Sequence, residues 1–396
     1  MIAIDLFAGT GWGVAAQRLG IEEYGVENMP EARASRVAAN MPLAQWSDVW
    51  DTLKFGEVRS AKFRAALLIA SPPCQTFSAA GSGAGRRALG DVLDLIDQRH
   101  WTMSGPWIQG AAHRQGMDDR TALILTPLAY AYRHLPEFIA LEQVPSVLPV
   151  WDAMAERLRT MGYSVATGIV NAEQYGVPQT RRRAILMARR DGKPVELPTP
   201  THSKYHNRDP KRLDDGVLPW VSMADALGFG LEERPSPTIT GGGTETGGAE
   251  PIAKLERYTG RADWRLRSNY GTSGDPKNRG ERGADQPAPT ITSKAGRMKW
   301  MHERPATTIA GDARVWPPGH KVNADDIRRL GEDAAREKYG DRADTEAIRL
   351  TPEECAVLQT FPRNFPFQGS KGKRHLQIGN AVPPLLAEAV LKTLIK

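Results

Sequence analysis

The first 190 residues alternate short apolar runs with segments of helical periodicity. The apolar runs predict buried strands at residues 2–7, 24–27, 66–70, 138–141, 164–170 and 184–188. The segments between them predict helices, most clearly at residues 14–19, 30–40, 118–132 and 151–161. Strands and helices at this spacing are typical of an α/β fold with a doubly wound, mostly parallel sheet that has helices on both faces. We expect this fold over residues 1–197.

The next 149 residues, 198–346, differ in composition and hydrophobic pattern, because Gly, Pro, Arg and Thr are frequent and long apolar runs are few. This composition predicts a second, irregular and β-rich domain, with one polar helix at residues 324–339. The sequence Pro-x-Pro-Thr-Ile occurs at residues 235–239 and 287–291, and a looser copy occurs at residues 305–309. The copies are unequally spaced, which excludes a solenoid, and each predicts a proline-stiffened lead into a short edge strand.

Helical texture returns in a C-terminal segment, residues 347–396. Thr351, followed by Pro and two Glu, predicts a helix start with a cap and an acidic first turn. Residues 377–384 are expected to form a turn that leads into a terminal helix at residues 385–394.

Composition narrows the class of protein. The chain has 396 residues, of which 40% are hydrophobic and 25% charged, so we expect a globular protein of about two to three domains. No apolar run approaches the roughly 20 residues of a membrane span, and the first residues lack the basic region of a signal peptide. Two cysteines, Cys74 and Cys355, are too few for a disulfide framework, which favours a reducing cytoplasm. Cys355 is expected in the core, and the eight histidines show no metal-ligand spacing.

Charge is divided unevenly between the two parts of the chain. Residues 1–180 hold 15 Lys and Arg against 18 Asp and Glu, whereas residues 181–396 hold 37 against 28. A basic surplus in one part fits a face that binds a polyanion. An arginine-rich surface that is merely solvated accounts for the charge equally well.

The turn after the first expected strand carries alternate glycines, Gly9, Gly11 and Gly13. Such a turn lets the backbone approach a ligand and leads into a helix N-terminus. Its glycine spacing differs from that of the dinucleotide fingerprint. Glu27 ends the second strand, where a carboxylate can accept the hydroxyls of a ribose. Together these features indicate an adenosine-containing cofactor without a pyrophosphate, and a simple turn is the alternative.

Two candidate reactive groups follow strands of the same sheet. Cys74 comes after Pro72-Pro73, which fix the backbone at the carboxyl edge where open α/β folds bind ligands. A buried structural cysteine is the alternative, but the polar residues that follow are poor core neighbours. Glu142 closes another strand at this edge and is a candidate general acid. Residues 79–116 are expected to be mostly irregular and to form a lid or binding loop.

A further pair of candidates, Arg181 and Arg183, alternates along an extended run and therefore shares one face. A solvated basic strand is the alternative for this pair.

In this order the motifs resemble those of the DNA (cytosine-5) methyltransferase family. The family pattern Phe-x-Gly-x-Gly, Pro-Cys-Gln, Glu-Asn-Val, Gln-x-Arg-x-Arg and Gly-Asn-x-Val-Pro is matched by residues 7–11, 73–75, 142–144, 179–183 and 379–383. The Pro-x-Pro-Thr-Ile element is a further family feature. The resemblance implies a catalytic and cofactor-binding domain at residues 1–197 with the S-adenosylmethionine-dependent methyltransferase fold. It also implies a target-recognition domain at 198–346 and a C-terminal segment, 347–396, that returns to the catalytic domain.

The resemblance implies S-adenosylmethionine as the cofactor. The residues expected around it are Phe7, Ala8, Gly9, Thr10, Gly11, Trp12, Glu27, Asn28, Asp48, Val49, Pro73, Asn380 and Ala381. Within this set, Glu27 would hold the ribose, Asn28 would pack on the adenine, and Asp48 with Val49 would recognise the adenine edge. Asn380 would bring the C-terminal segment back onto the site. Trp12 stands where glycine is commoner and is expected to pack on the following helix.

The implied reaction methylates C5 of a cytosine that is flipped out of duplex DNA, with Cys74 bonded to C6 and Glu142 at N3. A free thiol has a pKa of about 8.5, so a nearby cation must favour the thiolate. Arg183 is the candidate for this cation, and Arg181 is expected to lie toward the base. The loop expected to close over the base carries Gln75, Ser78, Arg86 and Arg87. Gln143 replaces the usual Asn, which keeps the amide and lengthens it by one methylene.

The expected partner is double-stranded DNA, bound by a monomeric, cytoplasmic protein of bacterial or phage origin. Two alternatives remain. Methylation of a cytosine in structured RNA fits poorly with so large a recognition region. A DNA-binding regulator without turnover fits poorly with an intact Cys74 and Glu142.

Overall fold

The computed structural model describes residues 1–54, 65–73, 89–206, 208–209, 211–228, 264–267, 282–291, 298–302 and 348–396. The chain divides into two compact units. The first unit comprises Met1–Gly228, Asp285–Gly296 and Thr351–Lys396, and the second comprises Phe229–Ala284 and Arg297–Leu350. Residues 198–228 belong to the first unit because most of their contacts are with that unit, although their composition resembles that of the residues that follow.

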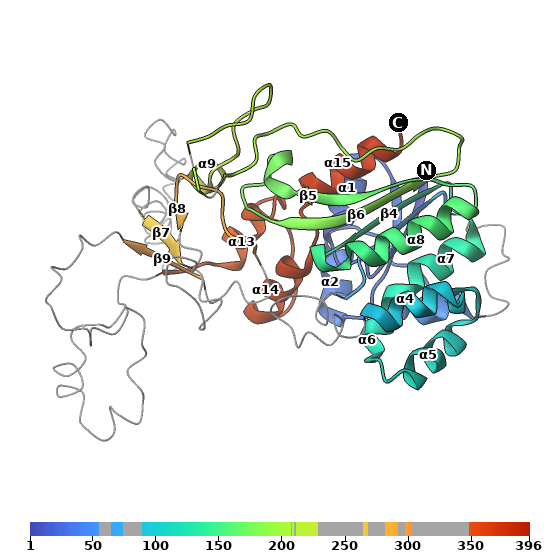
Figure 1. Cartoon of the computed structure of the whole chain (residues 1–396). Helices are drawn as coiled ribbons and strands as arrows, with labels where there is room; N and C mark the ends of the chain where they lie inside the picture. Colours follow the sequence, from blue (N-terminus) through green and yellow to red (C-terminus); the bar gives the residue numbers. More distant parts are fainter. Residues whose placement is uncertain are drawn as a thin grey trace, which may run out of the picture. The chain divides into compact units, whose positions relative to one another are not determined.

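A six-stranded sheet forms the centre of the first unit (Figure 1). Its strands are β1 (Ile2–Leu6), β2 (Glu22–Val26), β3 (Leu67–Ala70), β4 (Phe138–Gln143), β5 (Ser164–Asn171) and β6 (Arg182–Arg189), in the order β2-β1-β3-β4-β6-β5. The pairs among β2, β1, β3 and β4 are parallel, whereas β6 runs antiparallel to both β4 and β5. The expected mostly parallel α/β sheet is therefore confirmed.

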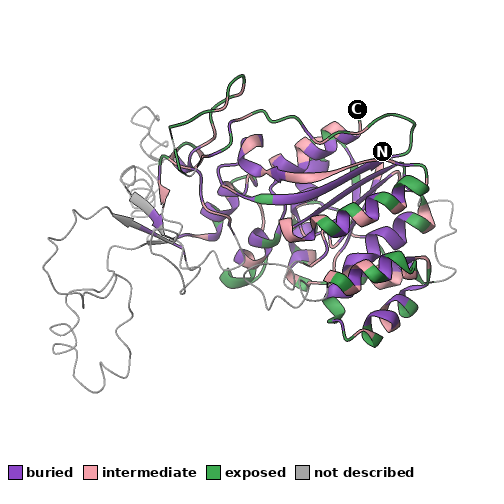
Figure 2. Ribbon diagram, viewed as in Figure 1, coloured by how far each residue is buried: buried purple, intermediate pink, exposed green. Residues whose placement is uncertain are grey.

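Helices cover both faces of this sheet. Those of the first unit are α1 (Gly11–Arg18), α2 (Pro30–Ala38), α4 (Leu89–Asp97), α5 (Gly105–Arg114), α6 (Asp119–Ala122), α7 (Thr126–His134), α8 (Leu148–Thr160), α9 (Met223–Leu227), α13 (Pro352–Leu358), α14 (Lys371–Asn380) and α15 (Pro384–Leu394). One core lies beneath α4, α7 and α8, and the other lies beneath α1 and α15. In β3, Leu68 belongs to the first core and Ile69 to the second, so this strand is buried on both faces. Figure 2 shows that β4 and β6 of the same sheet are almost entirely buried.

The expectation that residues 79–116 are mostly irregular is wrong for the part that the structure describes. Residues 89–114 form α4, a short 3-10 helix (His100–Thr102) and α5. Their apolar residues recur at helical spacing, and Leu95 and Ile108 are among those buried in the first core. The Gly and Arg content of this stretch masked that periodicity.

The turn expected at residues 377–384 is also corrected, because α14 continues to Asn380. Ala381 is the first extended residue, and α15 begins at Pro384. Thr351 caps α13 as expected, accepting from the Glu354 backbone amide while the Glu354 carboxylate accepts from Thr351. Cys355 is fully buried, and burial raises the pKa of its thiol.

The second unit contains a four-stranded antiparallel sheet in the order β10-β9-β7-β8. Its strands are β7 (Trp264–Arg267), β8 (Arg282–Gly283), β9 (Lys299–His302) and β10 (Ile348–Arg349). Leu266 and Trp300 face each other in register and are buried. Short strands were expected here, whereas the helix expected at residues 324–339 lies outside the described residues.

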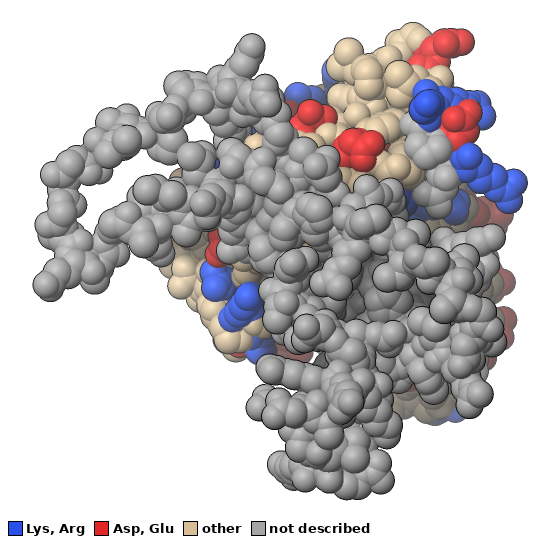
Figure 3. Space-filling view, turned by 90° about the vertical axis from the view of Figure 1, so that its left-hand side faces the viewer, with Lys and Arg blue, Asp and Glu red and all other residues tan. Residues whose placement is uncertain are grey.

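On the face shown in Figure 3, basic side chains of the described residues stand beside acidic ones. None of the helices in the described segments is long and apolar enough to cross a membrane.

The C-terminal helix α15 packs on α1 and on the sheet, so we expect it to be essential to the stability of the first unit. Leu391 is fully buried there, and Leu391→Ala should lower the free energy of unfolding by about 2–5 kcal/mol in urea denaturation. Leu218 is 61% exposed, and Leu218→Ala should change it by less than about 0.5 kcal/mol. Equal effects of the two substitutions would contradict this account of α15.

Candidate active site

One cavity of about 260 Å³ lies at the carboxyl ends of β1 to β4. Most of its lining comes from residues 7–12, 26–29, 71–73, 142–144, 376–377 and 379–382. This is the edge at which open α/β sheets bind ligands, because the connections that leave the parallel strands diverge there. The volume is near the lower end of the roughly 300–1,000 Å³ range of small-molecule pockets.

Most of the residues singled out from the sequence line this cavity. They are Phe7, Ala8, Gly9, Thr10, Gly11, Trp12, Glu27, Asn28, Val49, Pro73, Glu142, Arg181, Arg183, Asn380 and Ala381. Asp48 is not among the lining residues; its carboxylate accepts a hydrogen bond from the Trp50 amide at 3.0 Å and caps a 3-10 helix. The expected nucleophile and loop residues, Cys74, Gln75, Ser78, Arg86 and Arg87, lie outside the described residues.

The lining also includes residues that the motifs did not single out, namely Met29, Ala32, Ser47, Leu376 and Gln377. Ala32 and Gln377 belong to α2 and α14, and their approach to the cavity is set by helix packing. Ser35 on α2 lies 2.7 Å from Gln377 Oε1 and accepts from the Gln368 amide, also at 2.7 Å. Ala32 and Gln377 are identified as part of the site only by the tertiary contact between α2 and α14.

Glu27 holds the glycine-rich turn closed. Its carboxylate accepts hydrogen bonds from the Gly9 and Met29 backbone amides, each at 2.8 Å. Phe7 and Gly9 within the turn have φ values of 64° and 47°. The left-handed conformation costs a non-glycine residue such as Phe7 about 1–3 kcal/mol, so the surrounding contacts must maintain it. Each oxygen of Glu27 retains a lone pair for a further donor from the cavity.

The C-terminal segment lies directly against this turn. A Cβ atom on Gly11 would be 2.1 Å from Val382 O, so only glycine permits the contact. Trp12 is buried in the core beneath α1 and α15, and its indole donates to Ser71 Oγ at 2.9 Å. The turn after β1 is thereby joined to the end of β3.

Three ionisable side chains are buried beneath the turn. Glu23 and Arg36 form an ion pair at 2.6 Å, and Asp5 lies beside them with its side chain fully buried. Burial, and secondly the charge of Glu23, raises the pKa of Asp5 well above its usual range. Burial also raises the pKa of Glu23, against the opposing effect of Arg36. Of the two carboxyls, Asp5 is the one that the geometry favours in the neutral form.

The opposite end of the cavity holds Glu142, which is 5% exposed at the end of β4. Arg183 Nε lies 2.6 Å from Glu142 Oε1. Gln143, the next residue, donates from its amide to Pro72 O, and its amide oxygen accepts from the Val144 backbone at 2.6 Å. This amide links the end of β4 to residues 71–73, which follow β3.

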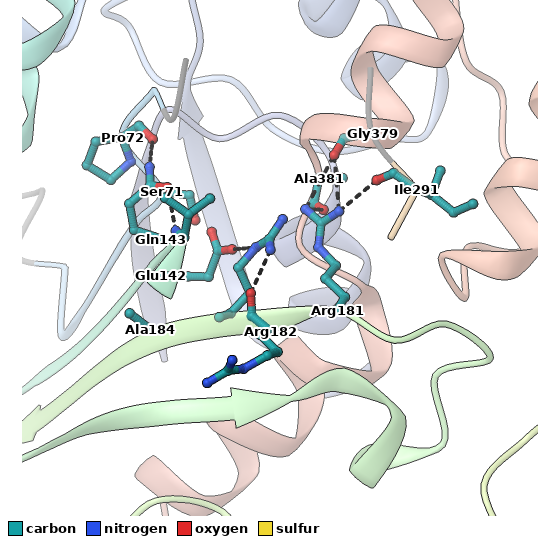
Figure 4. A network of polar contacts seen from close by, with 12 residues as sticks. Ser71, Pro72, Glu142, Gln143, Arg181, Arg182, Ala184, Ile291, Gly379 and Ala381 are labelled. Atoms are coloured by element: carbon teal, nitrogen blue, oxygen red, sulfur yellow. Dashed lines mark hydrogen bonds and ion pairs between the residues drawn. The ribbon is translucent and has the colours of Figure 1, made fainter. Parts of the chain in front are cut away.

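Arg181 lies apart from the Glu142 pair and is nearly fully buried. Its terminal nitrogens donate to Ile291 O at 2.8 Å and Ala381 O at 2.9 Å, with longer contacts of 3.2 and 3.3 Å to Gly379 O (Figure 4). These contacts hold the part of the lining that comes from residues 376–382, the C-terminal wall of the cavity, in place.

The middle Pro-x-Pro-Thr-Ile copy packs on the segment before β6. Ala288 forms an isolated parallel bridge with Gln179, and Ile291 N donates to Gln179 Oε1 at 2.8 Å. Thr290 Oγ1 donates to Thr180 O at 2.7 Å. The expected edge strand is therefore reduced here to a single bridge; the other two copies lie outside the described residues.

The sequence is similar to those of known DNA methyltransferases. A family model described as C-5 cytosine-specific DNA methylase matches residues 108–396. The type II methyltransferase M.SacI of Streptomyces achromogenes is 27% identical over 343 residues, covering 83% of this chain and 71% of that protein. The type II methyltransferase M1.HphI of Haemophilus parahaemolyticus is 24% identical over 405 residues, covering 99% and 86% respectively.

Among solved structures, a protein described as a DNA modification methyltransferase, encoded within a prophage (E. coli), has a TM-score of 0.55 at 19% identity. The match covers 100% of this chain and 98% of that chain. This likeness supports the expected methyltransferase fold. Among the described residues, no group of three or more His, Cys, Asp and Glu side chains could hold a metal ion.

The buried carboxyl of Asp5 should make stability depend on pH. Because its pKa is raised in the folded protein, the native state binds the proton more tightly, and the free energy of unfolding falls as pH rises from about 4 through the folded pKa. Asp5→Asn removes this dependence, so its stability relative to wild type should increase with pH in urea denaturation between pH 5 and 9. Glu156→Gln, at an exposed position on α8, is the matched control. A difference between Asp5→Asn and wild type that stays constant with pH would contradict the prediction.

Proposed function

Since the chain belongs to the C-5 cytosine-specific DNA methylase family, we propose that it transfers a methyl group from S-adenosylmethionine to C5 of a flipped cytosine in a specific duplex DNA sequence. One observation carries the proposal. The Glu142–Arg183 pair and the turn held by Glu27 line the same cavity. Pro73, the residue before Cys74, lines it as well. A thiol, an acid and a methyl donor that act on one ring must reach a common space.

The cavity residues fit an adenosine-bearing methyl donor. The Glu27 carboxylate, with lone pairs left after its two backbone bonds, would accept the ribose hydroxyls. Phe7 and Val49 supply apolar surface for the adenine, and the glycine-rich backbone allows close approach. S-adenosylmethionine, when bound, supplies an electrophilic methyl group on a sulfonium centre. Asp48 caps its helix, so we assign the edge contacts of the adenine to its neighbour Val49 alone.

Cytosine C5 is a weak nucleophile, and Cys74 would activate it. The thiolate sulfur forms a bond to C6, and the electron pair of the C5–C6 double bond moves toward C5 while Glu142 interacts with N3. C5 would then take up the methyl group, whose bond to the sulfonium sulfur breaks and leaves its electron pair on that sulfur. Loss of the C5 proton to solvent returns the electron pair, and the bond between sulfur and C6 breaks. Covalent catalysis divides one difficult substitution into easier steps.

Because Arg183 forms an ion pair with Glu142, we propose that it acts on this carboxyl. With Nε 2.6 Å from Oε1, the guanidinium fixes the orientation of the carboxyl that meets the base. Arg181 is engaged by carbonyl oxygens of the C-terminal wall, so its proposed role is to shape the cavity. A direct contact between Arg181 and the base, expected from the sequence, is not part of the proposal.

The target cytosine must leave the duplex, because its ring faces are stacked there, and flipping costs a few kcal/mol. Residues 181–396 carry nine more Lys and Arg than Asp and Glu, which supports binding of the phosphate backbone. We assign sequence recognition to the second unit with its short strands, since phosphate contacts position a protein and base contacts specify the site.

Trapping on DNA that contains 5-fluorocytosine tests the proposal. Fluorine at C5 cannot leave as a proton does, so a covalent adduct should accumulate with wild type in the presence of S-adenosylmethionine. Cys74→Ser should abolish both the adduct and methyl transfer, whereas Cys355→Ala, which changes the other cysteine, should retain both. Adduct formation on RNA alone would contradict the assignment of DNA as substrate. Full activity of Cys74→Ser would refute the mechanism.

Loss of the Glu142 carboxyl tests the second half of the mechanism. Glu142→Gln should lower the methylation rate by about 10²–10⁴-fold, the usual contribution of general acid catalysis, without weakening the binding of S-adenosylmethionine. Single-turnover methylation and calorimetric titration measure the two quantities. An unchanged rate would remove Glu142 from the reaction.

The amide of Gln143 should position the turn that precedes Cys74. Gln143→Leu removes the hydrogen bond to Pro72 O and should lower kcat by about fivefold, since one hydrogen bond contributes about 1 kcal/mol. Gln17 donates to Ala39 O at 3.0 Å on another part of the first unit, so Gln17→Leu is the matched control. If both variants have wild-type kcat, the amide of Gln143 has no positioning role.

A further inference from the structure

The Glu23–Arg36 pair lies beneath the glycine-rich turn, residues 7–12, on the side away from the cavity. The proposed reaction does not use this pair. Both side chains are at most 3% exposed, and the nitrogen–oxygen distance is 2.6 Å. Arg36 comes from α2 and Glu23 from β2, so neither belongs to the turn itself. A buried ion pair is weak evidence for stability, because desolvation of both charges offsets their attraction. Its position therefore needs another explanation.

The explanation lies in the remaining donors of Arg36. Nη1 donates to Gly9 O at 3.2 Å, and Nη2 donates both to Glu23 at 2.6 Å and to Pro42 O at 2.9 Å. The Gly9 amide donates to Glu27 at 2.8 Å. Both backbone polar groups of Gly9 are thus held, one from the cavity side by Glu27 and the other from behind by Arg36.

The surroundings leave room for this guanidinium. A Cβ atom on Gly25 would lie 2.4 Å from Arg36 Cζ, and one on Gly13 would lie 3.3 Å from Arg36 Nη1. Two glycines from different elements, β2 and α1, therefore border the path of the arginine to the turn. A planar group with five donors suits this position, because it can serve Glu23 and two carbonyl oxygens at once.

We propose that Arg36 is a positioning residue for cofactor binding: its bond to Gly9 O holds the turn at residues 7–12 in the shape that accepts S-adenosylmethionine, and Glu23 fixes the guanidinium. This inference rests on the proposed cofactor. The turn includes left-handed φ values at Phe7 and Gly9, a conformation that contacts from outside must maintain. Glu27 supplies one such contact, and Arg36 supplies the other.

The test must separate positioning from folding. Arg36→Met alone would leave Glu23 buried without its cation, which is strongly destabilising. In the double variant Glu23→Leu/Arg36→Met, both charges are removed, and an apolar pair of similar volume is often neutral for stability. Asp5 remains, and its buried carboxyl can stay neutral because its pKa is raised. The double variant therefore lacks the bond to Gly9 O while keeping a filled interior.

Calorimetric titration of the full-length variant with S-adenosylmethionine, without DNA, should give a Kd at least about tenfold above wild type. The KM for S-adenosylmethionine should rise in parallel, while kcat at saturating cofactor and the KM for DNA stay unchanged. A defect in folding alone would not produce this split. Arg36→Lys keeps a charge beside Glu23 and provides a second variant, with an expected Kd several-fold above wild type.

Arg133→Met is the matched control, because Arg133 also donates to two backbone carbonyl oxygens, Leu53 O and Met103 O. Its Kd for S-adenosylmethionine should equal that of wild type. Wild-type affinity in either Arg36 variant overturns the inference. Failure of the wild-type protein itself to bind S-adenosylmethionine overturns the proposed function instead, so the two failures are distinguishable.

Discussion

The shape of the site depends on the hydrogen bonds that the buried guanidinium of Arg181 donates. It joins the segment before β6 to Gly379, Ala381 and Ile291, which lie 110 to 200 residues further along the chain. A charge inside a protein needs its hydrogen bonds, so the carbonyl oxygens that supply them are constrained with it. Through Ala381 this constraint reaches Val382, whose backbone touches Gly11 in the glycine-rich turn. The C-terminal wall and the turn are thereby parts of one rigid frame.

Within that frame, the two ends of the cavity are built on the same plan. At one end the carboxylate of Glu27 is held by backbone amides, and at the other Glu142 is held by Arg183. In each case the orientation of an acid near the carboxyl end of a strand is fixed by hydrogen-bond donors: backbone amides for Glu27 and the Arg183 side chain for Glu142. Fixed donors around a functional carboxylate keep the cost of reorganisation low when a ligand arrives.

Much of this arrangement could be predicted from the sequence, because apolar runs set the strands and the motifs follow their ends. Glu27 and Glu142 were found in this way. The Glu23–Arg36 pair could not be, since the two residues lie on different elements and only packing of α2 on the sheet brings them together. The ion pair between Arg183 and Glu142 was not predicted either, for a similar reason. Alternation along a strand predicts which face a side chain shares and leaves its partner open.

Departures from the family pattern are explained by the contacts that the substituted residues make. Gln143 is one methylene longer than the usual Asn, and its amide reaches Pro72 O while accepting from Val144. Trp12 stands where glycine is commoner, and its ring is buried while its indole bonds to Ser71. Each side chain thus forms a hydrogen bond to the segment that follows β3. The contacts at this edge of the sheet therefore accommodate a different residue at these two motif positions.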